Sequence, residues 1–343
     1  MPTARKLPSG NWRCKIYLYK DSDGKEHYKS FTAKTKKEAE FLAIQYANQI
    51  HKDGEEQTFE EVYRFMTELK KPSISPNTHR GLVRDIDSSY FDSVRNIPIS
   101  KIDDVMVQKM INEWIARGLS PKTIRNKYVN FRSAIRTVYK HKDFDIIMPD
   151  KEKPDIYIPT DEEMKKILDT ARNTPVEMPI LLAAFMGMRR SEIEALAWSD
   201  VDMNARTIAV IQSVAIDADN NKVLKKPKST AGKRTVVMPD IVAEALYRHQ
   251  NDDTVRVVPL TGAGIYKRFK TILRHAGVND FRFHDLRHYY ASVMLSLSVP
   301  DKYAMELMGH ATPSTLKNVY QHTMQNKKEE IASALNAHFS GNF

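Results

Sequence analysis

Most side chains in this chain that could do chemistry lie in four short segments of its C-terminal half. They include two arginines, two histidines, a lysine and a tyrosine. His284 and Arg287 are three residues apart, so they occupy neighbouring positions on one helical face. The segments are residues 187–202, 225–239, 284–292 and 307–322, and the six side chains are Arg189, Lys228, His284, Arg287, His310 and Tyr320.

These residue types suit transesterification of a phosphodiester. Two guanidinium groups can meet the negative charge that builds on the non-bridging oxygens, with charge-assisted hydrogen bonds of about 1.5–3 kcal/mol each. A free tyrosine has a pKa of about 10, so forming tyrosinate at pH 7 costs about 4 kcal/mol, which a cationic pocket or a nearby histidine base could offset. Taken singly, each residue also has an ordinary structural explanation, and only their order and spacing indicate a site.

The acidic residues near these segments do not suggest a metal centre. Glu192, Asp200, Asp202 and Asp285 are scattered, whereas a two-metal nuclease needs clustered carboxylates. We therefore predict no metal and no cofactor. Glu192 and Asp285 are interpreted as helix-start residues that could have the further role of holding an arginine.

The composition of the chain narrows the classes of partner. The 343 residues carry 53 Lys and Arg against 43 Asp and Glu, a formal net charge of +10 that favours a polyanion. No apolar run approaches the roughly 18 residues that a spanning helix needs, and the N-terminus lacks the apolar stretch of a signal peptide. We expect a protein of the cytosol or an equivalent compartment, which in bacteria is the cytoplasm or nucleoid, without membrane contact. Cys14 is the one cysteine, which excludes internal disulfides and thiolate zinc sites.

Two segments concentrate the positive charge. Residues 1–37 contain ten Lys and Arg against three acids, and residues 122–142 contain seven and no acid. In the second segment apolar residues recur at helical spacing, and Arg125, Arg132 and Arg136 share another face. We predict that this face, with Lys122 at its start, follows DNA phosphates; a solvated helix face is the alternative.

The elements of the N-terminal half form two predicted parts. Residues 10–34 alternate apolar and polar side chains, which predicts two or three strands, and a helix follows from Thr35, whose hydroxyl can cap it with Glu38 three residues on. Residues 51–57 indicate a linker. Four helices are then predicted near 58–70, 76–90, 103–117 and 120–141, two of them beginning at Ser75-Pro76 and Ser120-Pro121.

The C-terminal part has mixed α/β character. Residues 142–160 carry three prolines without a period and indicate a second linker, after which a helix begins at Thr160. Gly187 is expected to form a flexible link before Arg189. Two helices are predicted over 160–198, strands over 207–216, 222–227 and 233–238, and helices over most of 240–337.

The predicted fold class is multidomain α+β. It consists of a small β-sheet-plus-helix domain (1–56), an all-α four-helix domain (57–155) and a mixed α/β, mostly helical domain with a three-stranded sheet (156–343).

The order Arg189, Lys228, His284-x-x-Arg287, Gly309-His310 and Tyr320 resembles that of the tyrosine recombinases, the phage-integrase-like site-specific DNA recombinases. The HDLRH segment and a Gly-His pair followed by tyrosine ten residues after the histidine are together quite specific. The resemblance is strongest over residues 160–325. Residues 57–140 are similar to the helical core-binding domain of that family, and residues 8–51 to the small arm-binding domain of lambda-type and conjugative-transposon integrases.

The resemblance implies a role for each of the six residues. Arg189 and Arg287 would clamp the scissile phosphate, Tyr320 would attack it, and Lys228 would protonate the departing 5′ oxygen. His284 and His310 would complete the phosphate site. Three further lysines are close enough in sequence to replace Lys228, namely Lys225, Lys226 and Lys233. Met188, Ser298 and Pro313 depart from the common family pattern without removing a functional group.

The implied function is integration or excision of a mobile element through a covalent 3′-phosphotyrosyl intermediate. The partners would be double-stranded DNA, at core and arm sites, and a homo-tetramer on two duplexes, with accessory DNA-bending or directionality proteins as further candidates. Residues 327–343 would dock on a neighbouring subunit or on their own domain. Two alternatives stay open: a non-catalytic DNA-binding regulator, which would not need Tyr320, and a type IB topoisomerase, which would not need an arm-binding domain.

Overall fold

The computed structural model describes residues 3–20, 26–44, 46, 57–151, 157–225, 233–250 and 254–309. Lys228, His310, Tyr320 and the segment 327–343 lie outside these residues. The chain divides into two compact units, Met1–Lys153 with Ile216–Asn221, and Pro154–Ala215 with Lys222–Phe343. Among the described residues, no helix is both long and apolar enough to cross a membrane.

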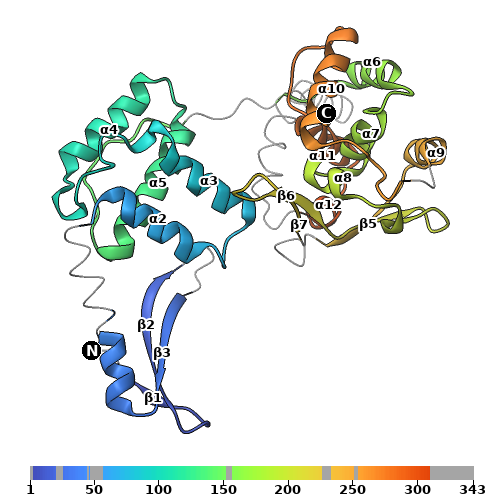
Figure 1. The fold of residues 1–343 in the computed structure, drawn as a ribbon. Coiled ribbons are helices and arrows are strands. Elements are labelled where there is room, and N and C mark those ends of the chain that lie inside the picture. Colours follow the sequence, from blue (N-terminus) through green and yellow to red (C-terminus); the bar gives the residue numbers. More distant parts are fainter. Residues whose placement is uncertain are drawn as a thin grey trace, which may run out of the picture. The chain divides into compact units, whose positions relative to one another are not determined.

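The first unit begins with an antiparallel sheet covered by a helix (Figure 1). Strands β1 (Arg5–Lys6), β2 (Trp12–Lys20) and β3 (Glu26–Ala33) lie in the order β1-β2-β3. Residues 36–44 are helical, and Thr35 Oγ1 accepts a hydrogen bond from Glu38 N at 3.2 Å, as predicted for the cap. Ala39 and Ala43 of this helix are buried with Cys14 of the sheet. The helix therefore covers the sheet face that carries Cys14.

The predicted four helices follow, with ends close to the predicted ones. They are α2 (Phe59–Lys70), α3 (Pro76–Asp87), α4 (Asp104–Ala116) and α5 (Pro121–Val138), with short 3-10 turns η1 (Ser89–Phe91) and η2 (Ile99–Lys101). Ser75 and Ser120 cap α3 and α5, and a proline fills the first helical position after each. The core contains rings of Phe59, Phe91 and Phe131 whose centroids lie 5.0–6.5 Å apart.

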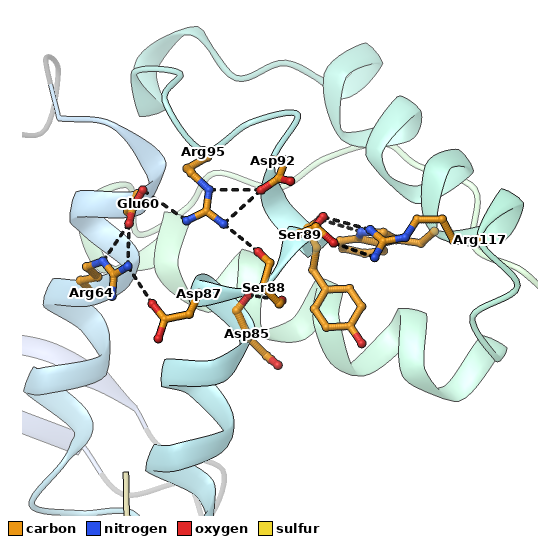
Figure 2. A network of polar contacts seen from close by, with 11 residues as sticks. Glu60, Arg64, Asp85, Asp87, Ser88, Ser89, Asp92, Arg95 and Arg117 are labelled. Carbon is orange, nitrogen blue, oxygen red and sulfur yellow. Dashed lines mark hydrogen bonds and ion pairs between the residues drawn. The ribbon is translucent and has the colours of Figure 1, made fainter. Parts of the chain in front are cut away.

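A network of ion pairs connects three parts of this bundle (Figure 2). Arg95 donates to Ser88 O at 2.7 Å and to Asp92 Oδ1 at 3.1 Å, and its Nη1 lies 3.3 Å from Glu60 Oε2. Arg64 contacts both Glu60, at 2.7 Å, and Asp87, at 2.8 Å. The hydrogen bond from Arg64 lowers the pKa of Glu60. The network thus links α2 to the end of α3 and to the loop after η1.

The prediction of a linker over 142–160 is wrong for its first ten residues. Residues 142–151 have no regular secondary structure, yet they pack along α4 and α5. Phe144 is buried against Phe131, with ring centroids 5.6 Å apart. Gln108 of α4 both donates to Ile147 O, at 3.3 Å, and accepts from Ile147 N, at 2.7 Å. The buried Phe144 ring and the hydrogen bonds of Gln108 hold this segment in place. Neither contact produces a repeating pattern in the sequence, so the packing was not predicted.

The second unit is built around a buried helix. Its helices are α6 (Asp161–Ala171), α7 (Glu177–Met186), α8 (Arg190–Ala195), α9 (Asp240–His249), α10 (Gly262–His275), α11 (Asp285–Ser296) and α12 (Asp301–Met308), with the 3-10 turn η3 (Trp198–Asp200). All residues of α7 except Phe185 are buried, and α7 packs against α6, α8, α9 and α11. Thr160 caps α6, as predicted.

Two predictions for this unit need correction. Three helices, not two, lie within 160–198, because Asn173 and Gly187 adopt left-handed backbone conformations (φ 59° and 60°) that end the helical path. The strand predicted over 207–216 is two strands, β5 (Thr207–Val210) and β6 (Ser213–Ile216). The turn hydrogen bonds Asp217 N to Asn221 O and Asn220 N to Asp217 O fold β6 back on β7 (Lys222–Lys225).

The three-stranded sheet therefore has a different composition from the predicted one. It contains β4 (Val201–Asp202), β5 and β8 (Arg234–Val237), all antiparallel, while β6 and β7 pair separately. Arg234 pairs with Val210, and side chains along β8 alternate between buried and exposed. Arg234 is thus on the same buried face as Val236.

Candidate active site

Three of the six predicted catalytic residues lie within the described residues, and their elements pack together. α7 ends at Gly187, Arg189 immediately precedes α8, and Arg287 lies on α11, with His284 just before that helix. The expected flexible link at Gly187 is not observed. Gly187 is a left-handed cap (φ 60°), and a Cβ there would lie 2.5 Å from Tyr290 Cδ1. Close contact with the Tyr290 ring and a left-handed backbone both require glycine, so the chain leads into Arg189 along a defined path.

Three arginines converge on the C-terminal end of α12. Arg234 Nε donates to Leu307 O at 2.8 Å, Arg287 Nη2 to Met308 O, and Arg189 Nη2 to Gly309 O at 2.8 Å. Each guanidinium group takes one of three successive carbonyls that a helix end leaves without intrahelical partners. The negative end of the helix dipole favours these cations. His310 is the next residue in the chain.

Glu192 joins two of these arginines. Its side chain is 6% exposed and accepts from Arg189 Nη1 at 2.6 Å and from Arg234 Nη2 at 2.8 Å. It also accepts from Arg189 N at 2.9 Å at the start of α8. Burial alone would raise the pKa of Glu192, but hydrogen bonding to Arg234 and the charges of Arg234 and Arg189 lower it to about 2. Both interpretations of Glu192, helix start and arginine holder, are confirmed.

Arg287 is among the most buried side chains of the unit, with 1% exposed. It donates to Gly187 O as well as to Met308 O, which places α11 against the end of α7 and the end of α12. Burial and the nearby charge of Arg189 lower its pKa. A guanidinium group carries five N–H donors, and these two contacts use two of them.

His284 is electrostatically coupled to both arginines. Burial of the ring, the nearby His288 imidazole and the Arg287 guanidinium lower the pKa of His284 to about 4, so its ring is neutral at pH 7. The two imidazole centroids are 5.3 Å apart. A neutral imidazole has one donor and one acceptor nitrogen, which suits proton transfer or hydrogen bonding to a phosphate oxygen. Asp285, on the next position, caps Arg282 N at 2.9 Å and binds the Arg282 side chain at 2.7 Å.

Arg234 is a functional residue that was not predicted from the sequence. Its side chain is 3% exposed, and it contacts both Glu192 and α12. A signal was present, since alternation along the predicted strand 233–238 places Arg234 on the same face as Val236 and Met238. A charged residue on an apolar strand face is rarely buried without a partner.

The other tyrosines of α11 and α12 have surroundings of their own. Tyr289 is buried, and its hydroxyl donates to Asp161 at 2.7 Å. Tyr290 is partly buried against Gly187, and burial raises its pKa. Both are helix-packing residues. Tyr303 on α12 is 58% exposed.

The predicted DNA-binding face of α5 has partners within the chain. Arg136 Nη2 lies 2.8 Å and Arg132 Nη1 3.7 Å from Asp143 oxygens, and Arg125 Nη2 donates to Pro149 O at 2.6 Å. Lys122 is exposed at the start of the helix. The acid that balances this face comes from beyond the segment 122–142, so three of its arginines hold the packed segment 142–151.

Within the part of the chain that the structure describes, no three His, Cys, Asp or Glu side chains lie close enough together to hold a metal ion. The described charges of the site are three guanidinium groups and one carboxylate. Such a set can bind an anion that carries up to two negative charges.

Comparison with known proteins supplies the family. Residues 159–327 match the model of the phage integrase family. The chain belongs to this family of tyrosine recombinases. The resemblance described from the sequence is confirmed, and family membership makes the chain a site-specific DNA recombinase.

The relatives extend this likeness to most of the chain. A tyrosine recombinase XerC-like protein of Caldanaerobacter subterraneus subsp. tengcongensis is 27% identical, and the alignment covers 95% of each protein. The Tn1549 transposon integrase, solved in complex with transposon right end DNA, is 18% identical with a TM-score of 0.67, over 80% of this chain and 100% of that one. A lambda integrase tetramer bound to a Holliday junction is similar in fold, at 17% identity and a TM-score of 0.54, over 93% and 94%.

Proposed function

We propose that this recombinase integrates or excises a mobile element by cutting and rejoining DNA strands through a 3′-phosphotyrosyl intermediate. The observation that carries the proposal is the convergence at the end of α12. Arg189 immediately precedes α8 and Arg287 lies on α11, yet they donate to the carbonyls of Gly309 and Met308, the two residues before His310. Motifs far apart in sequence thus meet at the segment that leads to Tyr320.

The proposed reaction needs one bond formed and one broken at phosphorus. The Tyr320 oxygen attacks the scissile phosphate, the bond to the 5′ oxygen breaks, and a 3′-phosphotyrosine and a free 5′ hydroxyl result. The hydroxyl proton of Tyr320 passes to a base, and Lys228 supplies a proton to the 5′ oxygen. Arg189 and Arg287 offset the charge on the non-bridging oxygens. His310 and His284, of which His284 is neutral, complete the phosphate site. Attack by a 5′ hydroxyl reverses these steps and rejoins the strand.

Residues 1–56 are proposed as an arm-type DNA-binding domain. The helix covers the sheet face of Cys14, and the register of β1, β2 and β3 puts a second set of side chains on the opposite face. These are Arg5, Arg13, Lys15, Tyr17, Tyr28, Ser30 and Thr32, nearly all of them exposed. Lys140 lies over the Tyr17 ring at one end of this face, 4.2 Å from its centroid. Cationic and hydroxyl side chains on an exposed strand surface can contact phosphates and base edges in a groove.

The other two domains and the partners are proposed as follows. Residues 57–155 are proposed as the core-binding domain and 156–343 as the catalytic domain. Four copies would act on two duplexes, in line with the fold shared with lambda integrase, which has been solved as a tetramer on a Holliday junction. Accessory DNA-bending or directionality proteins are proposed as further partners, and residues 327–343 as a segment that docks on a neighbouring copy or on its own domain.

The test is a covalent protein–DNA adduct that depends on Tyr320. A target duplex is first selected from fragments that span the junction of the element with its host, and a nick placed beside the scissile phosphate traps the intermediate. Tyr320→Phe should abolish the adduct and leave duplex binding within about twofold, because only one hydroxyl is lost and the cationic surface persists.

Tyr303→Phe is the matched control, since Tyr303 is the exposed tyrosine of α12. It should form the adduct at the wild-type rate. An adduct formed by Tyr320→Phe, or none formed by the wild-type protein on any junction fragment, would overturn the proposed function.

A further inference from the structure

Arg234 is a buried arginine outside the six residues of the proposed site. It begins β8 and forms a two-pronged contact with Glu192, with Nη2 to Oε2 at 2.8 Å and Nη1 to Oε1 at 3.3 Å. Its Nε donates to Leu307 O at 2.8 Å. One side chain therefore connects the start of α8, the end of α12 and the strand that follows the segment containing Lys228.

The charges near Glu192 indicate what the contact between Arg234 and Glu192 contributes. Arg189 and Arg234 contact the Glu192 carboxylate, and Arg287 lies close enough to be affected by its charge, so the three guanidinium groups and one carboxylate leave two positive charges in excess. A phosphodiester carries one negative charge, and its five-coordinate transition state carries two. Without Arg234, the carboxylate of Glu192 would be matched by Arg189 alone, and of the guanidinium groups in the described part of the site only Arg287 would remain unneutralised to meet two negative charges.

The geometry separates the two partners of Glu192. Arg234 takes both carboxylate oxygens and is 3% exposed, whereas Arg189 makes a single side-chain contact and is 35% exposed. Arg189 is thus held at one nitrogen by Glu192 and at another by Gly309 O, with much of the group still accessible. Arg234 therefore neutralises the Glu192 carboxylate, and the same carboxylate orients Arg189.

We infer that Arg234 is a positioning residue for strand cleavage, which satisfies Glu192 and fixes the end of α12 so that the charge of Arg189 remains available to the phosphate. This inference rests on the proposed function. Arg234 itself does not touch the DNA, so its loss should slow the chemical step and spare binding. A residue that only supports the fold would change stability alone.

The experiment measures single-turnover adduct formation and duplex affinity for four proteins: wild type, Arg234→Met, Arg234→Lys and the double variant Arg234→Met with Glu192→Gln. Arg234→Met should cleave about 10- to 100-fold more slowly, with duplex affinity within about twofold, since the phosphate clamp acts mainly in the transition state. Arg234→Lys should be intermediate, because one ammonium group cannot reach both Glu192 oxygens and Leu307 O in fork geometry.

The double variant gives the deciding result. Glu192→Gln removes the carboxylate that Arg234 no longer satisfies, and so frees the charge of Arg189. The double variant should therefore cleave at least fivefold faster than Arg234→Met. Arg248→Met is the matched control, because Arg248 binds the buried carboxylate of Glu177 at 2.7 Å in the same unit and contacts no site residue among those described. It should lower the melting temperature and leave the cleavage rate within about twofold.

Wild-type cleavage by Arg234→Met would overturn the inference. So would a slow Arg234→Met that Glu192→Gln does not restore, because Arg234 would then act through the fold and not through Arg189. Both outcomes require that the wild-type protein forms an adduct and that this adduct depends on Tyr320. Absence of that adduct would overturn the proposed function, and the inference would fall with it.

Discussion

Glu192 is the residue at which charge, burial and the proposed chemistry meet. Its pKa is about 2 in the folded protein, against an ordinary value of 4.5. A lowered carboxyl pKa stabilises the fold above pH 4.5, and the stabilisation is lost as the pH falls from 4.5 towards 2. Protonation would leave Arg234, which is buried, beside a neutral partner.

Glu192→Gln should therefore lower the free energy of unfolding at pH 7 by about 3 kcal/mol, because one charge of a buried pair is removed. The difference from wild type should shrink as the pH falls from 4.5 towards 2, where the wild-type carboxylate is itself neutralised. Urea unfolding followed between pH 7 and pH 3 measures it, with Glu162→Gln, an exposed position of α6, as the control. A difference that stays constant with pH would contradict the linkage.

Lys228 is the residue whose role is tested most directly by changing the substrate. If it protonates the 5′ oxygen, replacing that oxygen by sulfur removes the need for it, because a thiolate is a far better leaving group. Lys228→Ala should be severely slowed on ordinary DNA and largely restored on the sulfur-substituted strand. Arg189→Ala should not be restored, since the phosphate charge still needs its clamp. Restoration of Lys233→Ala instead would transfer the role to that lysine.

Elements that depend on local sequence were predicted well, and those that depend on distant contacts were not. Ser75, Ser120 and Thr160 cap helices as expected, because a hydroxyl and the backbone three residues on decide a cap. The division of 207–216 into β5 and β6 depends on a turn, and the packing of 142–151 depends on contacts with α4 and α5. Arg234 was missed for the same reason, since its partner Glu192 lies 42 residues away.

The cationic face of α5 is predicted to contact DNA phosphates, and the structure changes how this should be tested. Arg132→Ala and Arg136→Ala should each weaken core-site binding and reduce the salt slope by about one unit per lost phosphate contact. Asp143→Asn removes the acid that pairs with both and should strengthen binding. Lys165→Ala, an exposed cation of α6, serves as the control. An unchanged salt slope in both α5 variants and in Asp143→Asn would assign these arginines to holding segment 142–151.

At the scale of the whole molecule, the proposed function needs two separate DNA contacts from one chain. The N-terminal sheet has one face closed by its helix and the other lined with cationic, aromatic and hydroxyl side chains. The second unit carries the site at α12. A chain that holds arm and core DNA together raises the local concentration of each for the other, and this gain disappears when one contact is removed.

Deleting residues 1–56 should therefore spare adduct formation on a short core duplex and severely reduce integration on full-length attachment DNA. A finer variant pair tests whether the open sheet face is the cause. Lys15→Ala lies on that face, whereas Lys29→Ala lies on the face with the helix, where its ammonium group is 4.6 Å from the ring centroid of Tyr46. Integration on full-length DNA should fall for Lys15→Ala and not for Lys29→Ala, with core cleavage unchanged in both. Equal loss on the short and full-length substrates after deletion would make the segment part of the core-binding fold.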